Sequence, residues 1–149
     1  MYTADDFRQA FEDYAVYNDE LIKNTGMMGG ILKVFGFGKA HRDEGHEKFY
    51  QEMKMALEQV VKAQPDEETA DAIADVIFHA KNLYPEDRVS PYIFPAIEYL
   101  TIDLLPFLSA EKTEELLKEY RKTPYRLRVP VQKQTLAALE KVYRKRTAG

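Results

Sequence analysis

Cysteine is absent from the 149 residues of this chain. Its absence excludes disulfide bonds, thiolate catalysis, and zinc or iron–sulfur sites that depend on cysteine ligands. Serine is almost as scarce, because only Ser90 and Ser109 occur, and both stand where helix N-caps are expected. The composition therefore predicts neither a cysteine nor a serine nucleophile, and we expect no catalytic residue of either kind.

The sequence also lacks a long uninterrupted apolar run. Its longest apolar stretch, residues 89–108, contains Glu98, Asp103 and three prolines. A membrane-spanning helix needs about 20 predominantly apolar residues, and carboxylates near its centre are costly. The first residues are acidic and polar, unlike the basic and then apolar start of a signal peptide. We therefore expect a cytoplasmic protein that does not enter a membrane.

Glycine and proline are distributed unevenly along the chain. Six of the seven glycines lie between residues 26 and 45, and all seven prolines follow residue 64. Elsewhere apolar residues recur at spacings of three and four, and no segment keeps a period of two. This pattern predicts an all-α fold. We expect one domain over residues 1–149, a compact bundle or short array of five to six antiparallel helices.

Capping residues and apolar spacing predict helices at residues 3–24, 43–63, 66–83, 90–108, 109–122 and 130–146. Asp66 and Ser109 are suited to the N-cap position, and Pro130 is suited to the first turn. The helix over 90–108 is apolar around most of its circumference, which is typical of a central helix. Pro95 either bends this helix or marks its true start.

The glycine-rich apolar connection, residues 25–41, is the first candidate for function. It does not bind phosphate as a P-loop does, because Gly38-Lys39 lacks both the earlier glycine and the following serine or threonine of that motif. Its apolar residues either cover the open end of the helices, form a mobile flap that binds a partner or ligand, or touch a membrane surface. The candidate binding residues here are Met27, Met28, Ile31, Leu32, Phe35 and Phe37.

The histidines are the second candidate. Asp71, Asp75 and His79 follow one another at one-turn spacing, which could serve a metal, but they project opposite the apolar stripe and we expect them to face solvent. His46 lies in an apolar stripe, either as a core histidine or as a neutral base beside Glu98 or Asp103. Because the known helical metal motifs are missing, we expect no metal and no cofactor.

Charge is the third candidate. Residues 120–149 contain nine basic residues and one acid, a net charge of +8, so residues 1–119 carry −12 of the total of −4. Such a basic C-terminal segment indicates an anionic partner. We favour packing against the acidic part of the same chain or of a second subunit over nucleic-acid binding. The candidate residues are Arg121, Tyr125, Arg126 and Arg128.

Two tyrosines, Tyr92 and Tyr99, project near each other and beside Asp103. They are either ordinary residues at the boundary of the core or residues of an interface or ligand pocket.

Together these features favour a non-enzymatic helical module that binds a protein partner or a second copy of itself. Two alternatives stay open. One is a small-ligand-binding protein or enzyme with a pocket under the 26–40 flap, and the other is binding of nucleic acid or another polyanion through residues 120–149.

Overall fold

In the computed structural model, the described residues are 2–34, 37–84, 89, 92–122 and 130–148, with 20–34 and 37–44 described by their backbone alone. These residues form helices and turns without any strand, which confirms the all-α class. The helices within them are α1 (Ala4–Val34), α2 (Phe37–Lys62), α3 (Glu67–His79), α4 (Ile93–Leu100), α5 (Ala110–Arg121) and α6 (Pro130–Ala148). Two short 3-10 helices, η1 (Ala80–Asn82) and η2 (Leu105–Phe107), follow α3 and α4.

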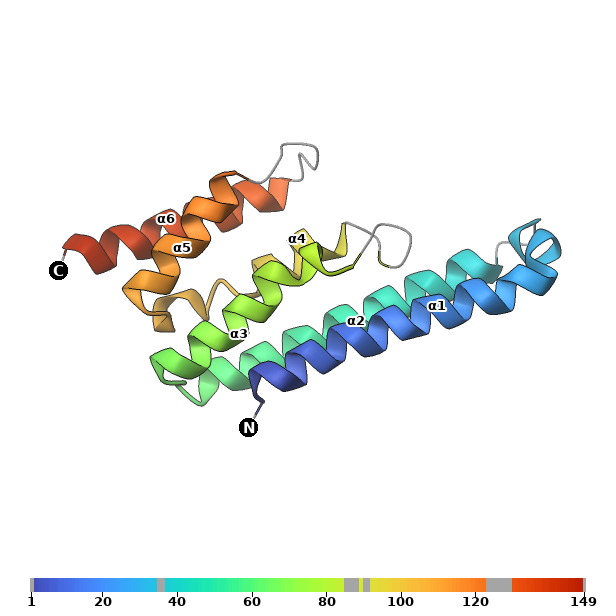
Figure 1. The fold of residues 1–149 in the computed structure, drawn as a ribbon, viewed down its shortest axis with the longest axis horizontal. Coiled ribbons are helices and arrows are strands. Elements are labelled where there is room, and N and C mark those ends of the chain that lie inside the picture. Colours follow the sequence, from blue (N-terminus) through green and yellow to red (C-terminus); the bar gives the residue numbers. More distant parts are fainter. Residues whose placement is uncertain (1, 35–36, 85–88, 90–91, 123–129, 149) are drawn as a thin grey trace.

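The helices are arranged as three successive pairs (Figure 1). Helix α1 packs along α2, and α5 packs along α6. The third pair lies between them, with α3 against α1, and with α4 against both α2 and α6. Because α4 contacts α2, α3 and α6, the prediction of a central apolar helix in this region is confirmed. Its Ile93 and Ile97 side chains are fully buried.

Side-chain caps begin α3 and α5 where the sequence predicts them, whereas α4 begins after Tyr92, which makes no side-chain cap, and not after Ser90. The Asp66 carboxylate accepts a hydrogen bond from the Thr69 amide at 2.8 Å, and the Ser109 hydroxyl accepts one from the Lys112 amide at 3.1 Å. These bonds satisfy amides that have no partner within the helix. Helix α2 ends just before Gln64, whose φ of 51° turns the chain out of the helix.

The predicted end of the first helix near residue 24 was wrong, because α1 continues to Val34 and α2 begins at Phe37. A glycine in a helix costs only about 1 kcal/mol relative to alanine, so the glycines weaken this segment without forbidding a helix. Residues 25–34 and 37–41 therefore belong to two helices. In Figure 1 this end of the α1–α2 hairpin extends past α3 and α4, so it forms no flap over them.

The single long helix predicted over residues 90–108 was also wrong. Helix α4 ends at Leu100, and the next residues form turns followed by η2. The Thr101 hydroxyl donates to the Glu98 carbonyl at 2.6 Å, and Pro106 has no amide hydrogen for a helical bond. Pro95 lies in the first turn of α4, where a helix does not need its amide hydrogen. The apolar residues that follow α4 are nevertheless buried, since Leu104 and Leu108 are fully enclosed.

An aromatic cluster joins α1, α2 and α4 in the core. The ring of Phe11 lies 5.3 Å from that of Phe49 and 6.3 Å from that of Phe94, and Tyr14 stacks on Phe49 at 4.4 Å. Phe7, Phe11 and Tyr14 recur at three- and four-residue spacing in the sequence and are all buried, whereas Tyr17, one turn further on, is 38% exposed. Aromatic pairs at these distances add to the stabilisation from burial.

Gly45 lets α2 approach Tyr17 of α1 closely, because a Cβ at this position would overlap the tyrosine ring. We expect Gly45→Ala to lower the free energy of unfolding by about 1 kcal/mol, the lower range for overpacking. In a Tyr17→Ala background the same change should raise it by about 1 kcal/mol, through helix propensity. Urea unfolding of the double-mutant cycle measures both values. An effect of the same sign in both backgrounds would contradict the close contact.

Candidate interaction surface

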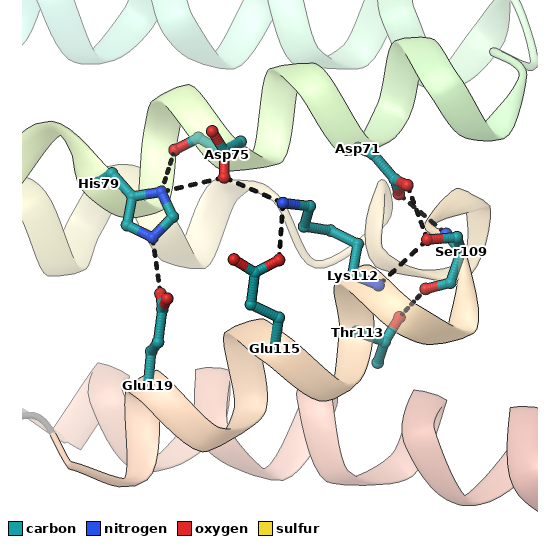
Figure 2. Close-up of polar contacts among 8 residues, drawn as sticks. All are labelled: Asp71, Asp75, His79, Ser109, Lys112, Thr113, Glu115 and Glu119. Carbon is teal, nitrogen blue, oxygen red and sulfur yellow. Dashed lines mark hydrogen bonds and ion pairs between the residues drawn. The ribbon is translucent and has the colours of Figure 1, made fainter.

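Helices α3 and α5 are joined by a row of polar contacts, shown in Figure 2 and called here the α3–α5 polar cluster. The Asp71 carboxylate accepts hydrogen bonds from the Ser109 amide at 2.9 Å and from its hydroxyl at 2.7 Å. The Lys112 ammonium lies between two carboxylates, 3.1 Å from Asp75 and 2.8 Å from Glu115. Alternating charges of this kind fasten the two helices together.

His79 lies at one end of the α3–α5 polar cluster. Its Nδ1 atom is 2.9 Å from the Asp75 carbonyl oxygen, and its Nε2 atom is 2.6 Å from a Glu119 carboxylate oxygen. Burial disfavours the charged imidazole, but the hydrogen bond and charge of Glu119, together with Asp75, outweigh burial and raise the pKa of His79. Both ring nitrogens are thus engaged in structural contacts.

The prediction that Asp71, Asp75 and His79 face solvent was only partly correct. These side chains lie opposite the apolar stripe of α3, and the Asp75 side chain is 48% exposed, but all three contact α5 or its N-cap residue (Figure 2). Within the described residues, no group of three or more histidine, aspartate or glutamate side chains is placed to hold a metal ion. The contacts within the α3–α5 polar cluster indicate a structural role.

A second polar group lies between the helices, in the protein interior. The Glu98 side chain is only 1% exposed, and Lys81 donates a hydrogen bond to it at 3.0 Å. The Lys81 ammonium also lies 5.1 Å from the centroid of the Tyr120 ring. Burial raises the pKa of Glu98 to about 7, although the charge and hydrogen bond of Lys81 act in the opposite direction. Burial and the nearby Glu98 charge also raise the pKa of Tyr120.

The hypothesis that His46 acts as a base beside Glu98 or Asp103 finds no support in the contacts of these residues. His46 is half-buried on α2 and makes no hydrogen bond to another described residue. Glu98 pairs with Lys81, while Asp103 is exposed. The carboxylate with the raised pKa is therefore hydrogen-bonded to Lys81 and not to the candidate base.

Two open hollows adjoin each other on the surface, on either side of Ile102 and Asp103; we call them together the α2–α6 surface. The first hollow has a volume of about 470 Å³ and lies between α2 and the end of α4. The second has a volume of about 310 Å³ and lies between Pro106 and α6. Besides Ile102 and Asp103, the first is lined by Lys54, Leu57, Glu58, Val61, Lys62, Tyr99 and Leu100. The second is lined by Pro106, Ala138, Lys141, Val142, Lys145 and Arg146.

Lysines edge both hollows of the α2–α6 surface. Lys54 and Lys62 belong to the first hollow, and Lys141 and Lys145 to the second. Among the described residues, none of these four ammonium groups has an ion-pair or hydrogen-bond partner. Arg146, by contrast, donates to the Pro106 carbonyl at 2.8 Å and pairs with Glu67 at 3.4 Å. The two linings contain five basic side chains, the four lysines and Arg146, and two acidic ones, Glu58 and Asp103, so the surface carries a net positive charge.

The structure places the predicted binding residues in different regions. Tyr99 is 37% exposed and lines the first hollow with Asp103, whereas Tyr92 is 63% exposed and is not part of the lining. Arg121 pairs with Glu140 of α6 at 3.6 Å, which is one contact within the basic segment. The side chains of Met27, Met28, Ile31, Leu32 and Phe37, and all of Phe35, Tyr125, Arg126 and Arg128, lie outside the described residues.

Sequence reasoning missed the lysines of α2 and the apolar residues of α6 as members of one surface. A signal was present, because Lys54 and Lys62 lie two turns apart and flank Leu57 and Val61 on the same helix. Lys141 and Lys145 are separated by one turn beside Val142 in the same way. The sequence does not indicate that α4 packs between these two helices.

Within the described part of the chain, no helix combines the length and apolar content needed to cross a membrane. Comparison with protein-family models, with curated protein sequences and with solved structures finds no match to this chain, so its geometry alone supports a proposal of function.

Proposed function

We propose that this protein is a non-catalytic interaction module that binds a protein partner through the α2–α6 surface. The observation that carries the proposal is the pair of adjoining open hollows, which have apolar linings and lysines at their edges. An apolar area bordered by polar side chains is typical of protein interfaces. Tyr99 is 37% exposed and lines the first hollow, and the half-buried Ile102 lines both hollows.

The geometry favours binding over catalysis for two reasons. Active sites and small-ligand sites enclose most of their ligand, whereas both hollows are only about half enclosed. In addition, Glu98, whose pKa is raised to about 7, is buried in contact with Lys81 and lines neither hollow. Perturbed groups often mark catalytic sites, but this one has the surroundings of a structural ion pair.

The end of the α1–α2 hairpin supports the same class of function as a second contact surface. Its sequence between Gly26 and Phe37 is rich in methionine, isoleucine, leucine and phenylalanine. Its backbone extends past α3 and α4 in Figure 1. An apolar sequence at a projecting helical end is a reasonable element for binding a partner or a second copy of the chain.

A photoreactive amino acid placed at Ile102 tests the proposal in cells that express the protein. We expect irradiation to yield a discrete adduct with a protein at Ile102, and none at Ala72, an exposed position on α3 that serves as the control. The photoreactive amino acid placed at Ile31 measures whether the end of the α1–α2 hairpin also contacts a partner. Adducts at Ile31 without any at Ile102 would contradict the α2–α6 surface, and equal background at all three positions would contradict an interaction function.

A further inference from the structure

We infer that the segment bound by the α2–α6 surface is an acidic amphipathic α-helix of another protein. This inference rests on the proposed function and adds the chemistry of the partner. It is argued from the two adjoining hollows, which share Ile102 and Asp103, from the lysines at their edges, which have no ion-pair partner among the described residues, and from the charge of the shared aspartate.

The dimensions of the surface fit a short helix. On α2, Lys54 and Lys62 are eight residues apart, about 12 Å along a helix. On α6, Ala138 and Arg146 have the same separation. A partner helix of three turns is about 16 Å long, and its apolar side chains recur on one face at each turn. Because Ile102 and Asp103 line both hollows, the hollows are adjacent, and apolar side chains from successive turns of one partner helix can enter them.

The unpaired lysines determine the charge of that helix. Lys54 and Lys62 border one hollow, and Lys141 and Lys145 border the other, without ion-pair partners among the described residues. Carboxylates that flank the apolar face of a partner can therefore pair with them without displacing an existing ion pair. Exposed pairs of this type contribute mainly to the association rate and to discrimination between partners.

Asp103 adds a constraint between the hollows, because a partner carboxylate placed above it would be repelled. The partner helix should therefore carry its acids toward its outer edges and an apolar or basic residue at the centre. This arrangement also distinguishes a protein helix from nucleic acid, whose phosphates would contact the lysines and leave the apolar hollows unfilled.

Labelled peptides test the inference directly. The probe is an 18-residue fluorescent peptide with leucines on one helical face and glutamates at its edges. One control peptide has lysine in place of glutamate, and the other has the same composition scrambled so that the leucines share no face. Measured by fluorescence anisotropy, we expect the glutamate peptide to bind at least about tenfold more tightly than either control, with affinity falling as salt is added.

Matched variants of the protein locate the binding. Lys141→Glu/Lys145→Glu should weaken the glutamate peptide at least about tenfold, whereas Asp103→Asn should tighten it severalfold. Lys122→Glu/Lys133→Glu makes the same change of charge at exposed positions outside the hollows and should have little effect. Equal weakening by both double variants, or weaker binding by Asp103→Asn, would overturn the inference.

The remaining outcomes separate this inference from the proposed function. If Ile102 forms a protein adduct but the glutamate peptide binds no better than its controls, the acidic helix is wrong and the interaction function stands. An adduct with a second copy of this chain would also overturn the inference. Binding to phosphatidylglycerol vesicles, without binding to phosphatidylcholine vesicles or to the peptide, would overturn it too, because the occupant would then be an anionic membrane surface. If neither adduct nor peptide binding is found, both proposals fail.

Discussion

Replacing Glu98 with glutamine is expected to stabilise the protein strongly at pH 8 and by no more than about 1 kcal/mol at pH 5. The carboxyl group is buried, and burial raises its pKa to about 7 from an ordinary value of 4.5. At pH 8 the native protein therefore holds a carboxylate in surroundings that favour the neutral acid. Glutamine is close to glutamate in shape, is always neutral, and still offers a carbonyl oxygen to the Lys81 ammonium.

The direction of this pH dependence follows from the number of protons that the folded and the unfolded chain bind. Between pH 4.5 and 7 the folded chain keeps the Glu98 proton that the unfolded chain has lost, so the free energy of unfolding decreases as pH rises. The difference between the two pKa values corresponds to roughly 3 kcal/mol once both states are ionised. Glu98→Gln removes this contribution, and the variant should therefore exceed the wild type by up to that amount at pH 8.

Urea unfolding at pH 5 and pH 8 measures the effect. Glu52→Gln, on an exposed position of α2, is the matched control and should change stability by no more than about 0.5 kcal/mol at either pH. A Glu98→Gln variant that is less stable than the wild type at pH 8 would show that the ion pair with Lys81 outweighs the burial of the carboxylate.

His79 contributes a second pH dependence in the same direction. Its folded pKa is raised, so the stabilisation from Glu119 and Asp75 is present in full below the unfolded pKa and is lost as pH rises through the folded pKa. Glu98→Gln should keep this part of the pH dependence, and the double variant with His79→Gln should lose it. The two groups are thereby distinguished in the same unfolding experiments.

The starts of α3 and α5 and the buried faces could be predicted from the sequence because they depend on neighbours within one or two turns. Asp66 and Ser109 cap their helices through amides three residues away. The stripe of Phe7, Phe11 and Tyr14 follows from helical spacing alone. The hairpin end differed because glycine lowers helix stability by an amount that neighbouring residues and packing can offset.

The polar contacts could not be predicted because their partners are remote in the chain. Glu119 lies 40 residues after His79, and Glu98 lies 17 residues after Lys81. The spacing of Asp71, Asp75 and His79 predicts one solvent-facing row, since nothing local indicates that α5 contacts them. The α2–α6 surface has the same origin, because it forms only when α4 and the following turns bring α2 and α6 to one face.

Phe11→Ala is the second change with a large expected effect, a loss of about 3–5 kcal/mol in the free energy of unfolding. The ring is 2% exposed and lies between Phe49 of α2 and Phe94 of α4, at centroid distances of 5.3 and 6.3 Å. Truncation leaves a cavity where three helices meet, and the remaining rings cannot fill it without moving the backbone. Phe11→Leu retains most of the buried volume and should lose less than half as much.

Val16→Ala on the same helix is the control for Phe11→Ala, because Val16 is 42% exposed and its truncation should change stability by no more than about 0.5 kcal/mol. Urea unfolding monitored by circular dichroism should give one cooperative transition for each variant, since α4 connects the α1–α2 hairpin to α6 through its own buried face. Equal losses for Phe11→Ala and Val16→Ala would contradict the packing of α1 on α2 and α4. Two separate transitions in Phe11→Ala would instead mean that the hairpin, and with it the Lys54–Lys62 edge of the α2–α6 surface, folds apart from the helices that complete that surface.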